Sequence, residues 1–165
     1  MIKIRSLKTN FSDDELKNIG GFNGGDYEAE AKQCNAFIEE AKAEKVQAEQ
    51  GQNAMIANLT TGDTSQLSKA EANIKESGEY ESTMMSTEME NYFKENGIDY
   101  ASSGVSRRQN AGEWDRAITN LENRAKVLEV ADACQEYGVD FPTKDLSKED
   151  IDSMIASLEA VQDRP

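Results

Sequence analysis

Two cysteines and a large excess of carboxylates are the side chains of this protein that could do chemistry. The 165 residues contain 32 Asp and Glu, 18 Lys and Arg, and no histidine. The chain therefore has no Ser-His or Cys-His nucleophile pair, no histidine zinc site and no ordinary acid–base group for neutral pH. A Walker A sequence, a Gly-x-Gly-x-x-Gly sequence and an EF-hand loop are also missing from it. Acidic runs such as Asp13-Asp14-Glu15 are typical of solvated helix faces and helix N-termini, so we expect no enzyme activity, no metal and no cofactor.

The two cysteines, Cys34 and Cys134, are isolated from each other in the sequence. Neither a metal site nor a disulfide scaffold has this spacing. We interpret both as small apolar side chains buried on helices. A bridge between them stays an open alternative, since it requires only that the two helices pack in the right register.

The elements that must position these side chains are predicted to be helices. From 27 to 59, apolar residues recur at alternating four- and three-residue spacing, which is typical of a coiled-coil seam. A second long helix is predicted over 112–137. We expect an all-α fold in which these two helices form an antiparallel coiled-coil pair, with short helices and irregular connections between and after them. The predicted seam consists of Cys34, Ile38, Ala41, Met55 and Leu59 in the first helix, and Trp114, Ile118, Leu121 and Leu128 in the second.

Capping residues and glycines predict the shorter helices. Ser12 with Glu15 is a capping-box sequence, and that helix is expected to end at Gly20-Gly21. Three more helices are predicted, at about 64–77, from Ser86 or Thr87 to Asn96-Gly97, and from Ser147 toward the end of the chain. Residues 78–83 and 98–110 are expected to be irregular.

Tyr92 and Phe93 are at the centre of the densest patch of large apolar residues in the middle of the chain. We expect this patch to pack on the long-helix pair; binding an external partner is the alternative. We divide the chain into an N-terminal arm with a short helix and a glycine-rich hinge (1–25), a helical core with an irregular middle (26–138), and a C-terminal short helix (139–165).

The bulk composition indicates association with other proteins. Leu, Ile, Val and Phe number only 29 of 165 residues and the net charge is −14, a combination found near the boundary with disordered chains. We therefore expect the thin seams to be completed by a helical partner, a chaperone or another copy of the chain. The acidity argues against nucleic acid as a partner. No apolar stretch of about 20 residues predicts membrane insertion, and no apolar segment after the N-terminus predicts a cleaved secretory signal.

Two runs of sequence carry a family resemblance. One is EMENYFKENGI, from Glu88 to Ile98, in which an acidic helical turn leads to a Tyr and an Asn-containing break; the other is GEWDRAITNLEN, from Gly112 to Asn123. Over roughly 66–128 the chain resembles the EspA/SseB-type secreted filament proteins of bacterial type III secretion. The resemblance implies a coiled-coil pair of long helices, export or surface location without a cleaved signal, and a chaperone that covers the helices. Because the second long helix is predicted to end at Gly138, we expect a needle-tip-like role as an alternative to a filament role.

Two alternatives stay open. The size and acidity suit a cytoplasmic helical adaptor or chaperone that acts as a dimer. In addition, FSDDELKNIGG, from Phe11 to Gly21, resembles the double-glycine leader of exported bacterial peptides, which implies an exported polypeptide from which the leader is removed.

Overall fold

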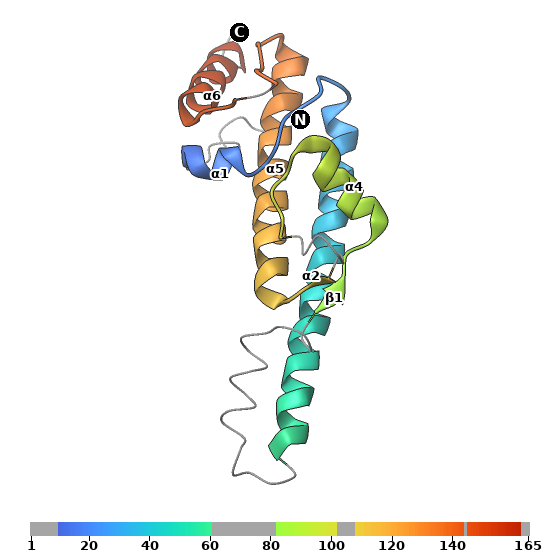
Figure 1. Cartoon of the computed structure of the whole chain (residues 1–165). Coiled ribbons are helices and arrows are strands. Elements are labelled where there is room, and N and C mark those ends of the chain that lie inside the picture. The colour runs from blue at the N-terminus through green and yellow to red at the C-terminus, as the bar shows by residue number, and fades with distance from the viewer. Residues whose placement is uncertain (1–9, 61–81, 102–107, 144, 163–165) are drawn as a thin grey trace.

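The computed structural model describes residues 10–60, 82–101, 108–143 and 145–162, with the backbone alone for 51–60 and 162. Within these residues the chain is mostly α-helical, as the sequence predicted, with one small two-stranded sheet (Figure 1). The elements are α1 (Asp13–Lys17), α2 (Tyr27–Thr60), β1 (Thr83–Met84), α4 (Thr87–Asn96), β2 (Arg108–Gln109), α5 (Ala111–Tyr137) and α6 (Lys148–Gln162).

The two long helices, α2 and α5, lie side by side and antiparallel. The Cys34 thiol donates a hydrogen bond to the Leu121 carbonyl at 3.2 Å, and nearer the start of α5 the Lys45 ammonium bonds Asp115 at 3.0 Å. Partner numbers fall along α5 as they rise along α2, which confirms the predicted pairing direction. Because α5 begins opposite this part of α2, the remainder of α2, to Thr60, extends past it (green in Figure 1).

The first part of the α2 seam is closed by α5 of the same chain. Cys34, Ile38, Ala41 and Ala48 are all buried, with no side chain more than 5% exposed. In this part of the seam, α5 of the same chain therefore covers the residues for which the sequence analysis expected a partner or a second copy. The count of Leu, Ile, Val and Phe had underestimated the core, because Tyr, Trp, Met and Cys residues outside that count also contribute to it: Tyr27, Cys34, Met85, Met89, Trp114, Cys134 and Met154 are all buried.

The shorter elements surround α5. In Figure 1, α5 lies between α2 and α4 on one side and α1 and α6 on the other. Fourteen residues of α5 are buried as a result, which is far more than one seam would bury. The part of the predicted N-terminal arm from Phe11 onward belongs to this same core, with Leu16 and Ile19 at 3% and 0% exposed.

Most helix ends follow the predicted caps, although α1 ends at Lys17, three residues before the predicted stop at Gly20-Gly21. The Ser12 hydroxyl and the Glu15 carboxylate complete a capping box on α1, and the Ser86 hydroxyl accepts a hydrogen bond from the Met89 amide of α4. Gly97 ends α4 with φ of 70°. The helix expected at about 64–77 lies outside the described residues.

Two further details correct the sequence analysis. α5 begins one residue earlier than predicted, at Ala111, where Asn110 forms a capping box with Glu113. The expected irregular segments contain a short antiparallel ladder in which Thr83 pairs with Gln109. Two-residue strands have too little alternation to be read from sequence, so only the fold reveals them.

Candidate functional site

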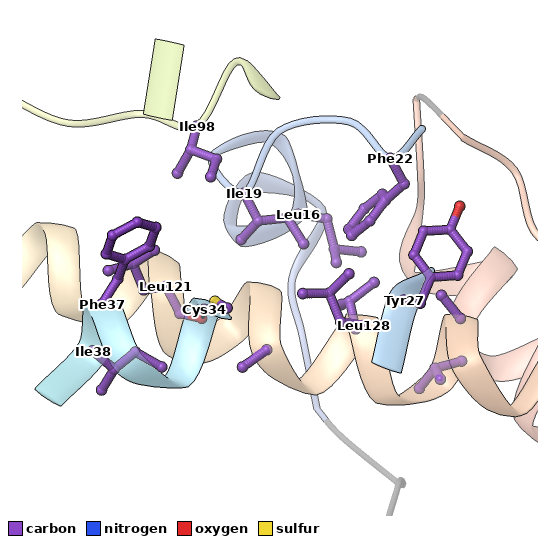
Figure 2. Close-up of a cluster of buried hydrophobic side chains, with 14 of the residues drawn as sticks. Leu16, Ile19, Phe22, Tyr27, Cys34, Phe37, Ile38, Ile98, Leu121 and Leu128 are labelled. Atoms are coloured by element: carbon purple, nitrogen blue, oxygen red, sulfur yellow. Dashed lines mark hydrogen bonds between the residues drawn. The ribbon is translucent and has the colours of Figure 1, made fainter. Parts of the chain in front are cut away.

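The predicted interaction residues lie mostly inside the molecule. Figure 2 shows Cys34, Ile38, Leu121 and Leu128 in one apolar cluster with Ile19. The buried members of the predicted set, none more than 5% exposed, are Cys34, Ile38, Ala41, Phe93, Trp114, Ile118, Leu121 and Leu128. Tyr92 is partly buried, and Met55 and Leu59 belong to the part of α2 described by its backbone alone. The described members of the set therefore bind the chain to itself.

The cysteines are both buried and free. Because Cys34 contacts the Leu121 carbonyl, Cys134 lies about 20 Å farther along α5 at 1.5 Å per residue, well beyond the reach of a disulfide. Burial raises the pKa of the Cys34 thiol to about 12 and that of Cys134 to about 11. Thiols with such pKa values are poor nucleophiles at neutral pH.

The polar centre of the molecule is Arg124 of α5, which the sequence analysis did not identify. Its side chain is 0% exposed although it carries a full charge. Glu30 of α2 provides the counter-charge: its Oε2 atom accepts hydrogen bonds from Nε at 3.1 Å and Nη2 at 2.8 Å of the guanidinium. The Glu30 side chain is 15% exposed, so the Arg124–Glu30 ion pair is almost completely shielded from solvent.

The remaining acceptors of Arg124 come from two other segments. Nη1 donates to the backbone carbonyls of Ile19 and Gly21, each at 2.8 Å. From α4, the Tyr92 hydroxyl accepts from Nε at 2.9 Å and the Asn96 side-chain oxygen accepts from Nη2 at 3.2 Å. All three guanidinium nitrogens therefore donate to groups of the chain itself, as a buried cation requires.

Aromatic rings enclose the same cation. The guanidinium carbon lies 4.4 Å from the ring centroid of Phe22 and 5.4 Å from that of Tyr92, both within cation–π range. The Tyr92 hydroxyl donates to Glu30 at 2.7 Å, and burial raises its pKa well above the usual range. The Tyr92 hydroxyl thus stays neutral, and it links the Glu30 carboxylate to the Arg124 guanidinium.

The backbone position between Ile19 and Gly21, whose carbonyls accept hydrogen bonds from Arg124, requires a glycine. Gly20 has φ of +80°, and a Cβ atom there would lie 2.3 Å from the Asn96 carbonyl oxygen. The neighbouring Gly21 amide donates to that same carbonyl at 2.9 Å. Residues 18–25, which we call the glycine loop, therefore cross the C-terminal end of α4 in direct contact.

One sequence signal points to Arg124. Together with Ala117, Leu121, Leu128 and Ala131 it follows four- and three-residue spacing along α5, so a charge falls in the middle of an apolar stripe. Such a charge is rarely buried without a partner. The acceptors could not have been found this way, because they come from three distant segments.

Other features of the described residues offer less chemistry. A shallow cavity of about 250 Å³ is lined by Leu16, Gly20, Gly21 and Leu146, with the exposed Lys17 and Asp145 also on its wall. No group of three or more His, Cys, Asp or Glu side chains in the described part could hold a metal ion. No helix of that part is long and apolar enough to cross a membrane.

Large apolar side chains are exposed near one end of the described body. Val46 on α2 is 48% exposed and Met84 on β1 is 49% exposed. Val46 lies next to Lys45, which pairs with Asp115 in the first turns of α5, so it sits where α2 begins to extend past α5.

Comparison with known proteins found no matching family model, no matching curated protein and no matching solved structure. The interpretation of the molecule therefore depends on its own geometry: a helical scaffold with an internal, fully paired cation and one helix that extends beyond the body.

Proposed function

We propose that this protein is a non-enzymatic protein-interaction or assembly subunit, and that the projecting end of α2 is its contact element. The single observation that carries this proposal is the length of α2 beyond the start of α5. Residues 50–60 contain no charged side chain, in a protein of which 30% of residues are charged and the net charge is −14. Through an uncharged helix end, two negatively charged protein molecules can make contact without bringing like charges together.

The partner we propose for this end of α2 is the same helix of a second copy. Met55 and Leu59 continue the four- and three-residue spacing of the buried seam into this segment, which supports coiled-coil contact with another helix. The exposed Val46 lies on the same helix, a few residues before this segment. A helical chaperone would use the same surface.

Sedimentation of the full-length chain over a series of concentrations tests self-association. We expect the mass to rise with concentration while far-UV helicity changes little, because the α2–α5 pair is already closed within one chain. Met55→Glu should lower the association, whereas the matched exposed change Gln47→Glu should not. A constant monomer mass would contradict assembly through this helix and favour a different partner.

For the cellular role we propose export by a bacterial type III secretion system, as a filament or needle-tip-like subunit. The support is the EspA/SseB-type resemblance, of which the runs 88–98 and 112–123 belong to α4 with its C-terminal cap and to the first half of α5. The alternative roles are a cytoplasmic adaptor dimer and a polypeptide with a removable double-glycine leader. Against the leader, Ile19 is buried and the Gly21 carbonyl binds Arg124.

A secretion assay separates these roles. The chain, tagged at its C-terminus, would be followed in culture supernatant of a type III-competent strain and of the same strain without the export apparatus. Appearance only in the competent strain, at full length, supports the proposal. Retention in both strains favours the adaptor, and a supernatant product that begins at Phe22 favours the leader. A cytoplasmic marker enzyme controls for lysis.

A further inference from the structure

Two segments that are far apart in the sequence meet at Arg124, and they also contact each other. The glycine loop and the C-terminal end of α4 share two backbone hydrogen bonds, from the Gly21 amide to the Asn96 carbonyl and from the Asp99 amide to the Asn18 carbonyl, each at 2.9 Å. The loop is continuous with α1, so residues 11–22, which we call the N-terminal segment, and α4 lie against the α2–α5 pair as neighbours.

Neither segment satisfies Arg124 alone. The N-terminal segment supplies the carbonyls of Ile19 and Gly21, and α4 supplies the Tyr92 hydroxyl and the Asn96 side-chain oxygen. If either segment leaves, the buried guanidinium loses two of the six hydrogen bonds described above in surroundings of low polarity, which is strongly unfavourable. Water that enters in place of the lost acceptors also reaches the acceptors that the other segment supplies to Arg124.

We propose that Arg124 is an interlock that makes the docking of the N-terminal segment and the docking of α4 cooperative, so that release of one releases the other. The consequence is a concealed apolar face. Met85, Met89 and Phe93 are each 0% exposed, and they stay covered only while α4 is docked. The position of the N-terminal segment thereby controls whether this face is available. The inference does not depend on the proposed function.

Amide hydrogen exchange of the full-length chain, followed by mass spectrometry of peptides from the N-terminal segment, α4 and α6, tests the interlock. Leu16→Ala, a change within α1, loosens the N-terminal segment from α5 at a residue outside the Arg124 hydrogen bonds. We expect exchange in α4 to become faster by about tenfold, a coupling typical of groups that share one network. Leu158→Ala is the matched control, because Leu158 is equally buried but lies on α6; it should speed exchange in α6 and leave α4 unchanged.

The reverse direction uses a mild change on α4. Tyr92→Phe removes only the hydroxyl between Arg124 and Glu30, and it should speed exchange in the N-terminal segment. Tyr100→Phe is its control, because Tyr100 also packs beside α4, through Phe93 at 5.1 Å between ring centroids, and lies outside the Arg124 network. Both variants keep their rings, so both should fold.

Two results would overturn the interlock. In one, Leu16→Ala speeds exchange in the N-terminal segment but not in α4, which would show independent docking. In the other, Leu158→Ala speeds α4 as much as Leu16→Ala does, which would show general loosening of the core. A faster N-terminal segment in Tyr92→Phe, with no change in Tyr100→Phe, would support coupling through Arg124 itself.

Discussion

At the scale of single residues, Arg124 determines how the centre of the molecule is organised. A buried ion pair often adds little stability over an apolar core, yet removing one partner is costly because the other charge stays behind unpaired. Arg124 has one acid, Glu30, and otherwise only neutral acceptors. The Glu30 carboxylate is therefore the group whose loss should matter most.

Glu30→Gln should lower the free energy of unfolding by about 3 kcal/mol, because it leaves the Arg124 charge buried without a counter-charge. The control is Glu28→Gln. That side chain is 71% exposed and, among the described residues, its ion pair is with the exposed Lys32, so its loss should change stability by less than about 0.5 kcal/mol. Urea unfolding followed by far-UV circular dichroism measures both. Equal effects of the two changes would contradict a buried role for Glu30.

The buried thiols predict sensitivity to alkali. Burial raises the pKa of Cys34 from 9.0 to about 12, so above pH 9 the unfolded chain loses this proton first. The stability from this group is fully present below the unfolded pKa and is lost as the pH rises toward the folded pKa. We expect the urea midpoint to fall as the pH rises from about 9 toward about 12, and to fall less steeply in Cys34→Ala. An unchanged slope in the variant would contradict the assignment.

At the scale of elements, the glycine loop shows that similar backbone angles can have different causes. Gly20 and Gly24 have almost the same positive φ, +80° and +78°. Beside Gly20 the Asn96 carbonyl leaves no room for a Cβ atom, whereas beside Gly24 there is open space. Only the first glycine is required by the contact between two elements.

Gly24→Ala should cost about 1 kcal/mol, the penalty of a left-handed conformation for a residue with a Cβ atom. Gly20→Ala should cost at least about 2 kcal/mol more, because the clash is with backbone that moves only if α4 moves. Thermal unfolding of the two variants measures the difference. Equal stabilities would show that the loop does not press against α4 as described.

At the scale of the whole molecule, net charge opposes compaction. The chain carries −14 charges at pH 7, and many of the described ion pairs are exposed pairs within one helix, such as Lys32 with Glu28 and Lys17 with Asp14. Exposed pairs of this kind contribute little to stability. Repulsion among the excess carboxylates is then the larger long-range electrostatic effect.

Added salt should therefore stabilise the protein. Ions screen the repulsion between carboxylates over about 10 Å at 0.1 M ionic strength, while Arg124 and Glu30 are buried and are screened much less. The melting temperature should rise as sodium chloride is added from low concentration to about 0.2 M. A fall in melting temperature over this range would mean that attractive surface pairs outweigh the excess negative charge.

The sequence by itself determined the helices and many of their ends. Helical spacing of apolar residues, the capping residues Ser12 and Ser86, and the stop at Gly97 are local signals, and a local signal acts through neighbours within one or two turns. The antiparallel pairing of α2 and α5 was also predicted and is confirmed.

Only the tertiary structure decided which segments meet. The register that keeps Cys34 and Cys134 apart, the ladder between β1 and β2, and closure of the seam within one chain all depend on contacts between distant residues. Arg124 depends on them most, since its acceptors Ile19 and Glu30 lie 105 and 94 residues away. The local sequence around a charge gives no information about such acceptors, because a buried charge is stabilised by whatever groups the fold brings within hydrogen-bonding distance.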